Sequence, residues 1–157
     1  MVQGAISRLE AGGRCRGQGN EVNLSLFDDP QQYNTDRDCW ATPSLVLRNL
    51  ERELGRMFTL DVCALPWSAK CPRFYTPQDN GLIQSWVVQD GDLWWLNPPF
   101  SDIRPWAAKA HAEFVAYGYE GVMILPSTCC GLDWFHDHVL PFAQVRFLRG
   151  RVAFIPP

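Results

Sequence analysis

The chain has 157 residues, of which 46% are apolar, and this is enough for one globular domain with a hydrophobic core. Its formal net charge of −3 argues against a protein that coats nucleic acid by bulk electrostatic attraction. No apolar run reaches the length of a membrane span, and residues 1–19 contain no signal-peptide core, so we expect a soluble cytosolic protein.

The cysteines do not follow the pattern of a disulfide framework or a metal site. No C-x-x-C pair occurs, and two adjacent cysteines are poorly placed to chelate one ion. We therefore predict no bound metal and reduced cysteines that mostly pack in the interior. The six are Cys15, Cys39, Cys63, Cys71, Cys129 and Cys130.

The amino-terminal quarter differs in composition from the rest of the chain. Residues 1–37 are rich in Gly, Gln, Asn and Asp and have no sustained hydrophobic period. We interpret them as a mobile or loosely docked leader, with a brief ordered piece at residues 22–27. Residues 38–157 are then expected to form one domain.

The first helix of this domain is predicted to start after residue 42. Thr42 is a good N-cap, and Pro43 suits the first helical position. The helix should stop near Gly55. Its apolar stripe would consist of Leu45, Val46, Leu50 and Leu54.

The next segments are typical of strands and a turn. Residues 58–64 form an apolar run that predicts a buried strand, yet the run carries one acid, Asp61. Burying an unpaired carboxylate is unfavourable, so Asp61 needs a partner or a functional role. A second short strand is expected at residues 73–75, followed by a turn at residues 77–81 that contains Asp79.

The central motif begins where a third strand ends. Residues 93–96 are apolar, and Asn97 is followed by Pro98 and Pro99, which lack N–H groups and leave nearby carbonyl oxygens unpaired. In an open α/β sheet, ligands bind at this carboxyl end of the strands. Phe100 adds an aromatic ring to the same place.

This motif suits the binding of a planar amino group on an aromatic ring. If the Asn97 side-chain oxygen and the Pro98 carbonyl accept its two hydrogens, the nitrogen lone pair localises and becomes more nucleophilic. Phe100 would then stack on the ring face, a contact worth roughly 1–3 kcal/mol per base.

A helix and a strand follow the motif. Residues 105–117 have helical spacing, with Trp106, Ala110 and Phe114 on one face and Lys109 and Glu113 on the other. Residues 121–126 form a further buried strand, and residues 127–131 a loop at the same edge as Asn97. This alternation of helix and strand predicts a parallel sheet.

Two histidines follow this strand at a spacing that disfavours a shared metal. His136 and His138 are two residues apart, which places them on different sides of a helix over residues 132–140. We interpret them as surface or DNA-facing residues.

The last residues of the chain predict a hairpin with a basic turn. Residues 145–148 and 152–155 are strand-like and flank a turn at residues 149–151. Arg146, Arg149 and Arg151 lie in an acid-free stretch and suit bidentate contacts to phosphate or guanine. A solvated face is an equally open interpretation.

The motifs taken together resemble one family. Asn97-Pro98-Pro99-Phe100 resembles the (D/N/S)PP(Y/F) motif of S-adenosylmethionine-dependent amino-methyltransferases. The wider pattern, collinear over residues 38–155, resembles the phage-type DNA N6-adenine methyltransferase (Dam) family. The segments that carry it are Trp40-Ala41-Thr42-Pro43, Leu60-Asp61-Val62-Cys63-Ala64, residues 75–82, the Asn-Pro-Pro-Phe motif and Gly150-Arg151-Val152-Ala153-Phe154.

The resemblance implies a fold and a reaction. The fold is a Rossmann-like α/β methyltransferase fold, with a mostly parallel sheet flanked by helices and a final strand missing or replaced. The reaction is methyl transfer from S-adenosylmethionine to adenine N6 in double-stranded DNA, with the target base flipped out of the helix. The expected location is the host or bacterial cytoplasm, with no membrane partner; the oligomeric state and the recognition sequence stay open.

The resemblance also implies residue roles. The catalytic set is Asn97, Pro98, Pro99 and Phe100. The cofactor set is Trp40, Thr42, Pro43, Asp61, Cys63, Ala64 and Asp79, although Asp79 is equally typical of a turn aspartate. The DNA contacts are Arg146, Arg149 and Arg151. The chain departs from the usual methyltransferase pattern after Asp61, where Ala64-Leu65-Pro66-Trp67 stands in place of a G-x-G motif.

Two alternatives remain open from the sequence. A protein glutamine methyltransferase also uses Asn-Pro-Pro with an aromatic residue but acts on a peptide amide. A DNA-binding module that keeps the fold without turnover would fit the missing glycine motif and the early carboxyl terminus.

Overall fold

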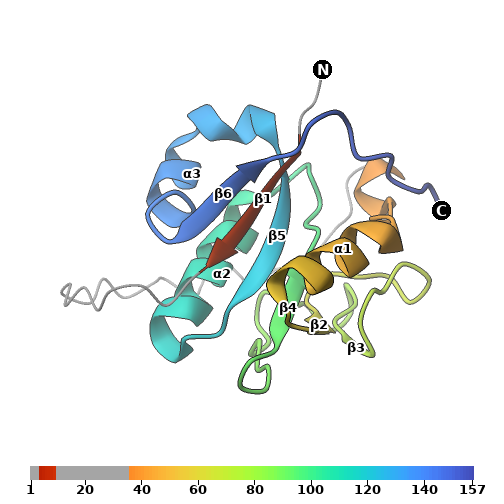
Figure 1. The fold of residues 1–157 in the computed structure, drawn as a ribbon, viewed down its shortest axis with the longest axis horizontal. Coiled ribbons are helices and arrows are strands. Elements are labelled where there is room, and N and C mark those ends of the chain that lie inside the picture. Colours follow the sequence, from red (N-terminus) through yellow and green to blue (C-terminus); the bar gives the residue numbers. More distant parts are fainter. Residues whose placement is uncertain (1–3, 10–35) are drawn as a thin grey trace.

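The strands of the described chain form a single sheet with helices on both sides. Figure 1 shows the computed structural model, which describes residues 4–9 and 36–157. The strands are β1 (Gly4–Leu9), β2 (Phe58–Asp61), β3 (Arg73–Phe74), β4 (Leu93–Leu96), β5 (Gly121–Pro126) and β6 (Ala143–Phe147). The helices are α1 (Ser44–Leu54), α2 (Arg104–Tyr117) and α3 (Asp133–His138), with short 3-10 helices η2 (Asp36–Cys39) and η3 (Ser127–Gly131).

The order of the strands is β3-β2-β4-β5-β1-β6. Neighbours among β3, β2, β4 and β5 pair in parallel, whereas β1 pairs antiparallel with both β5 and β6. This is the mostly parallel, Rossmann-like α/β sheet that the sequence predicts. The predicted strand at residues 121–126 is confirmed as β5, and the one at residues 93–96 as β4.

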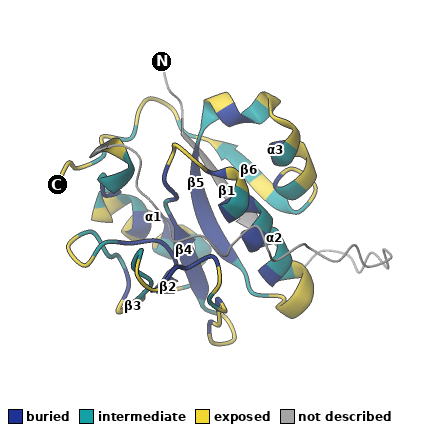
Figure 2. Cartoon of the chain, turned by 180° about the vertical axis from the view of Figure 1, so that it is seen from behind, coloured by how far each residue is buried: buried dark blue, intermediate teal, exposed yellow. Residues whose placement is uncertain are grey.

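The core consists of two layers, one on each face of the sheet. Successive side chains of a strand point to opposite faces, and in β4 this sends Trp94 and Leu96 into one layer and Leu93 and Trp95 into the other. α2 and α3 cover the first layer and α1 covers the second. Because both faces are covered, β4 and β5 are buried along most of their length (Figure 2).

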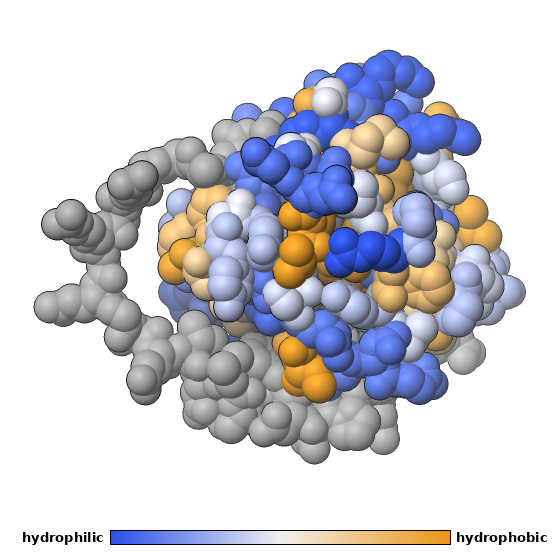
Figure 3. Space-filling model, turned by 90° about the horizontal axis from the view of Figure 1, so that it is seen from below, coloured by the Kyte–Doolittle hydropathy of each residue, from blue (hydrophilic) through white to orange (hydrophobic). Residues whose placement is uncertain are grey.

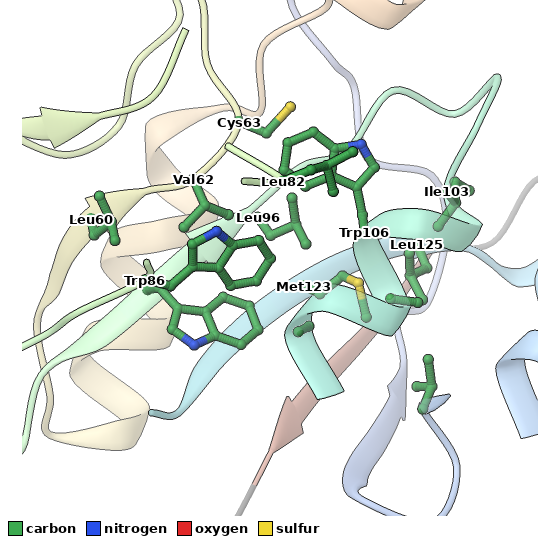
Figure 4. Packing of buried hydrophobic residues seen from close by; sticks show 14 of the residues in the cluster. Leu60, Val62, Cys63, Leu82, Trp86, Leu96, Ile103, Trp106, Met123 and Leu125 are labelled. Carbon is green, nitrogen blue, oxygen red and sulfur yellow. The ribbon is translucent and has the colours of Figure 1, made fainter. Parts of the chain in front are cut away.

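Tryptophans fill the layer beneath α2. Trp86 packs edge-on against Trp94, with 5.1 Å between ring centroids, and stacks on Trp106 at 6.2 Å. Figure 4 shows this cluster with aliphatic side chains around the indole rings. A Cβ at Gly121 would lie 1.9 Å from the Trp94 ring, so only glycine lets β5 approach β4 here.

The amino-terminal strand β1 is the main feature that the sequence analysis did not predict. Residues 4–9 belong to the segment interpreted as a mobile or loosely docked leader, but they lie in the sheet between β5 and β6. The ordered piece expected at residues 22–27 falls outside the described residues. The domain boundary near residue 37 stays a prediction.

The predicted carboxyl-terminal hairpin is wrong. The outer strand β6 pairs with β1, and residues 152–155 lie outside the sheet. Ile155 instead forms an isolated antiparallel bridge with Ala41, through hydrogen bonds of 2.8 and 2.9 Å. The last residues thus pair with the segment before α1 instead of with the open edge of β6.

Two details of the helices also differ from expectation. Thr42 does not cap α1, because the helix begins one residue later with Pro43 at the cap position and no side-chain cap bond. Leu45 is 58% exposed, and Leu47 and Leu50 are the buried residues of α1. The predicted end at Gly55 is confirmed by its left-handed conformation (φ 64°).

In α2, Lys109 and Glu113 are buried rather than on a solvated face. They form an ion pair one helical turn apart, with 2.5 Å between Lys109 Nζ and Glu113 Oε1. Pairing offsets the unfavourable burial of each charge, so a charged pair at helical spacing does not by itself mark an exposed face. None of the helices in residues 36–157 is long and apolar enough to cross a membrane.

We expect the Ser7→Pro variant to be less stable than the matched Ser7→Ala variant. The Ser7 backbone lies opposite Met123 of β5 and Val145 of β6, and proline removes its N–H from this ladder. The free energy of unfolding should fall by about 1–3 kcal/mol, measured by urea denaturation. Equal stability of the two variants would contradict the placement of β1 in the sheet.

Candidate active site

The candidate site lies at the carboxyl ends of the parallel strands, the upper edge in Figure 1. A cavity of about 310 Å³ opens there. Its walls come from the turn after β4, from η2 and the residue before Ala41, from the end of β5, and from the carboxyl-terminal segment. The lining residues are Arg37, Asp38, Trp40, Asn97, Pro98, Phe100, Ile124, Leu125, Pro126, Arg151, Val152 and Phe154.

The opposite end of the sheet has a different surface. Figure 3 shows the molecule from below the view of Figure 1, on the side of the amino ends of the parallel strands. On its coloured part, hydrophobic residues lie in separate groups between hydrophilic ones. The cavity with its aromatic and amide groups belongs to the other end.

Asn97 is oriented by one hydrogen bond. Its Nδ2 donates to the Trp40 carbonyl oxygen at 3.1 Å. A carbonyl oxygen can only accept, so the amide nitrogen must face Trp40 and Oδ1 must face away. Asn97 Oδ1 is buried and has no hydrogen-bond partner among the described residues. A buried acceptor without a partner is unfavourable, and Asn97, the residue that carries it, lines the cavity.

The two prolines give the turn a second available acceptor. Among the described residues the Pro98 carbonyl oxygen accepts no hydrogen bond, whereas the Pro99 carbonyl accepts one from Asp102 N–H at 3.2 Å. Both prolines are buried, and Pro98 lines the cavity. Two neighbouring residues that line the cavity, Asn97 and Pro98, therefore each carry an oxygen acceptor without a described partner.

Phe100 is the aromatic member of the site. Its side chain is 39% exposed and lines the cavity. Phe154 packs edge-on against it, with 5.7 Å between ring centroids and 89° between ring planes. An edge-to-face contact covers at most one face of Phe100, so Phe154 leaves at least one face of this ring uncovered for stacking.

Asp61 lies at the end of β2 and organises the loop that follows. It is 2% exposed, and its carboxylate accepts N–H groups of Lys70 at 3.0 Å and Cys63 at 3.3 Å. Burial raises the pKa of Asp61 to about 7, although these N–H groups and the charge of Lys70 act in the opposite direction. The sequence analysis expected a partner or a functional role for Asp61, and the structure shows two backbone N–H groups as its partners.

The other predicted cofactor residues lie near the same edge. Cys63 and Ala64 are buried directly after β2. Thr42 is also buried, and its Oγ1 has no hydrogen-bond partner in the part of the chain that the structure describes. Asp79 is exposed and accepts the N–H and the hydroxyl of Thr76 at 2.8 and 2.7 Å, which lowers its pKa. Asp79 therefore has the geometry of a turn aspartate. In the predicted cofactor set, Trp40 alone lines the cavity.

The comparisons with known proteins decide the family. The family model described as DNA N-6-adenine-methyltransferase (Dam) matches residues 30–157. The chain belongs to the Dam family. The DNA N-6-adenine-methyltransferase of Haemophilus phage HP1 is 35% identical over 122 residues, which cover 77% of this chain and 68% of that protein.

The match to a second relative covers a smaller share of that protein. The DNA N-6-adenine-methyltransferase of Escherichia phage T1 is 33% identical over 107 residues, which are 68% of this chain and 43% of that protein. No solved structure matches this chain. Neither a protein glutamine methyltransferase nor a silent DNA-binding module is favoured by these comparisons.

The predicted DNA-contacting arginines of this Dam-family chain differ in their surroundings. Arg146 forms an ion pair with Glu53, and its guanidinium also donates to Gln144 Oε1 at 2.9 Å. Arg149 and Arg151 are exposed. Of the three, only Arg151 lines the cavity.

Sequence reasoning gave no site role to several cavity residues, among them Arg37, Asp38 and Phe154. Arg37 and Asp38 lie beside the Trp40-Ala41-Thr42-Pro43 motif, which was the available signal. Phe154 closes the Gly150-Arg151-Val152-Ala153-Phe154 motif but was assigned to a hairpin. Their approach to Phe100 depends on long-range contacts that no local pattern encodes.

The two histidines, interpreted from the sequence as surface or DNA-facing residues, differ in their surroundings. His138 is half-buried, and its Nδ1 lies 3.1 Å from Nδ1 of His111 on α2. Burial lowers the pKa of both imidazoles. His136 is exposed and contacts the Cys130 carbonyl oxygen at 2.9 Å. Among the described residues no group of three metal-binding side chains occurs.

The cysteines of the described segments are thiols that form no disulfide with one another. Cys63, Cys71 and Cys129 are buried, and Cys39 and Cys130 are partly buried. Cys15 falls outside the described residues.

We expect the stability of this protein to depend on the ionisation of Asp61. Its pKa is about 7 in the folded chain and 3.8 without the burial, so the folded state favours the protonated form. The free energy of unfolding should therefore be highest near pH 4 and fall by up to about 4 kcal/mol as pH rises through 7. Urea denaturation from pH 4 to 8 would measure it.

The Asp61→Asn variant should lose most of this pH dependence because asparagine does not titrate. Asp90→Asn is the matched control, since Asp90 is exposed in the turn before β4 and should keep the parent's slope. Identical slopes for the parent and Asp61→Asn would contradict a carboxyl that is protonated on folding.

Proposed function

We propose that this chain transfers a methyl group from S-adenosylmethionine to N6 of adenine in double-stranded DNA, with Asn97, Pro98, Pro99 and Phe100 as its catalytic residues. The observation that carries the residue assignment is the Asn97 amide. Its Oδ1 is turned away from Trp40, buried and without a described partner at the wall of the cavity. Membership of the Dam family supplies the reaction class.

The cavity suits the target adenine. It lies between the turn after β4 and the end of β5 and has an amide oxygen, a free carbonyl oxygen and aromatic rings in its walls. The amine hydrogens of adenine would be accepted by Asn97 Oδ1 and the Pro98 carbonyl oxygen, and Phe100 would stack on the base. An adenine inside a duplex cannot reach these groups, so the nucleotide must be flipped out.

The two acceptors would change the reactivity of the amine. In free adenine the N6 lone pair is delocalised into the ring, which makes the nitrogen a weak nucleophile. Two acceptors that hold the N–H bonds out of the ring plane favour a localised lone pair directed at the methyl donor. The chain would act by alignment and by fixed dipoles, without a side chain that first removes a proton.

The cofactor is proposed to lie on the other side of Asn97. S-adenosylmethionine supplies a methyl group on a positively charged sulfur. β2 and β3 lie on the side of β4 opposite β5, so Asp61, Cys63 and Ala64 flank Asn97 from the side away from the cavity. The buried Thr42 hydroxyl without a described partner fits a polar group of this ligand.

The remaining cofactor assignments are Trp40, Pro43 and Asp79. Trp40 lies between the Asn97 amide and Thr42 in the chain and would border both ligands. Asp79 remains in the proposed set because its carboxylate is exposed after β3 and could accept ribose hydroxyls. Without a G-x-G motif, the loop after β2 is fixed by the Asp61 carboxylate instead of by close backbone approach.

Double-stranded DNA is the proposed partner, contacted by Arg146, Arg149 and Arg151. Arg151 is the strongest candidate, since it is exposed at the cavity and forms no described ion pair. Cytoplasmic location and a catalytic domain over residues 38–157 remain predictions.

The Asn97→Ala variant should lose methyl transfer and keep cofactor binding. It removes the amine acceptor but leaves β4 and both prolines, so the single-turnover rate should fall by about 10²–10³-fold. Incorporation of labelled methyl groups into adenine of unmethylated plasmid DNA would measure the rate, and calorimetry with S-adenosylmethionine would measure binding.

Gln89→Ala is the matched control, because Gln89 is an exposed amide at the other end of β4. It should retain the parent rate. An Asn97→Ala protein that methylates DNA at the parent rate would refute the assignment, and methylation of a glutamine-containing peptide instead of DNA would refute the substrate.

The three arginines should differ in their contribution to DNA affinity. Arg151→Ala should weaken binding about equally for all sequences and reduce the salt slope by roughly one, as expected for a phosphate contact. Arg146→Ala should change the slope less, because Glu53 already pairs with Arg146. Titration of each Arg→Ala variant across salt, Arg149→Ala included, measures both quantities. Parent-like affinity and slope for Arg149→Ala and Arg151→Ala together would exclude this segment from the DNA surface.

A further inference from the structure

Residues 38–41, which run from η2 into the segment before α1, hold both ends of the turn after β4. At the first end, Asn97 Nδ2 donates to the Trp40 carbonyl at 3.1 Å. At the other end, the carboxylate of Asp38 accepts the Ser101 N–H at 3.1 Å and the Ser101 hydroxyl at 2.6 Å. Two residues that are close in the chain, Asp38 and Trp40, thus bind Ser101 and Asn97, which lie at the two ends of the turn.

The turn has little to hold it in place on its own. Pro98 and Pro99 have no N–H groups, and among the described residues the one backbone bond within the turn runs from Asp102 N–H to the Pro99 carbonyl. The position of Phe100, which is partly exposed, therefore depends on its neighbour Ser101. Asp38 is the side chain that binds Ser101.

The same segment also positions the opposite wall of the cavity. Ala41 forms two backbone hydrogen bonds with Ile155, at 2.8 and 2.9 Å. This bridge brings Phe154 against Phe100. Asp38, Trp40 and Ala41 consequently connect all of the proposed base-contacting groups to one short piece of chain.

We propose that Asp38 is a positioning residue for methyl transfer, which holds Phe100 in its stacking position through the two hydrogen bonds to Ser101. This inference rests on the proposed function, because it assumes that Phe100 stacks on the target base. Asp38 touches neither reacting atom. Its effect passes through the geometry of the turn.

The positioning role of Asp38 can be distinguished from the electrostatic effect of its negative charge, because the two predict opposite changes in different measurements. A carboxylate in the wall of a cavity that receives a nucleotide repels phosphate, so its removal should by itself leave DNA binding unchanged or tighter. A positioning role predicts the opposite for turnover, since a misplacement of about 1 Å costs about 10²-fold in rate. The two effects therefore have different signs in different measurements.

The first experiment compares Asp38→Ala with Asp102→Ala. Asp102 is an exposed acid next to Ser101 with no described side-chain hydrogen bond, so its variant removes the same charge from the same turn. We expect Asp38→Ala to lower the single-turnover rate of adenine methylation by about 10- to 100-fold. Affinity for S-adenosylmethionine should stay at the parent value, and affinity for DNA should not fall. Asp102→Ala should keep the parent rate.

The Ser101→Ala variant tests the route of the effect and does not depend on the folding of Asp38→Ala. It removes the hydroxyl bond and keeps the backbone bond, so the rate should fall by less than in Asp38→Ala. The variant with both Asp38→Ala and Ser101→Ala should be no slower than Asp38→Ala alone, because both changes act on the same Asp38–Ser101 contact. A parent-like rate in Asp38→Ala, or independent effects that multiply in the double variant, would overturn the proposal.

A second readout does not require activity. Fluorophenylalanine placed at position 100 reports the order of this ring by its ¹⁹F line shape. The line should shift or broaden in Asp38→Ala and remain parent-like in Asp102→Ala; an unchanged line in Asp38→Ala overturns the proposal. A parent protein that methylates no DNA would refute the proposed function. The ¹⁹F comparison would still show whether Asp38 holds the Phe100 ring in place, because it does not require activity.

Discussion

The site depends on the absence of N–H groups at Pro98 and Pro99. A buried strand that ends in two prolines cannot continue its ladder, so β4 delivers the turn to the middle of the sheet edge and then supplies no further hydrogen bonds. The Pro98 carbonyl is left available, which is useful for a ligand, but the turn must be held from elsewhere. Segments that precede and follow it by more than fifty residues therefore meet at this point.

The strand order places the turn after β4 between the two proposed ligand sites. β4 is the central member of the parallel part, with β2 on one side and β5 on the other. Its side chains alternate between the two core layers, so the strand is fixed from both faces before it reaches Asn97. A site built on such a strand is more rigid than one built on a free loop. In the proposed complex, Asn97 would face the base, and the loop held by the Asp61 carboxylate would face the cofactor.

Much of this arrangement follows from local sequence patterns, and the rest does not for physical reasons. The apolar runs before Asn97 and at residues 121–126 predict buried strands because both faces of a parallel strand are covered. Asp61 signals a special environment because a carboxylate stands in an apolar run. By contrast, Asp38 and Phe154 enter the site through contacts far along the chain, to Ser101 and Phe100. Lys109 and Glu113 mislead because their charges suggest a solvated face, although they lie three and seven residues after Trp106 and therefore on the buried side of α2.

The strand β1 has a consequence for how the chain reaches its native state. Residues 4–8 pair with residues 122–126, and residues 5–9 pair with residues 143–147. The first strand of the described chain, β1, can therefore pair only after β5 and β6 have been synthesised. Contacts between such distant residues require closure of a long loop before they contribute stability, and they slow folding. Until that closure, β5 and the incoming β6 have unpaired edges that can associate with other chains. The folding of this small protein is therefore expected to be late and cooperative at the β1 side of the sheet, even though the β2–β4 side can assemble from neighbouring segments.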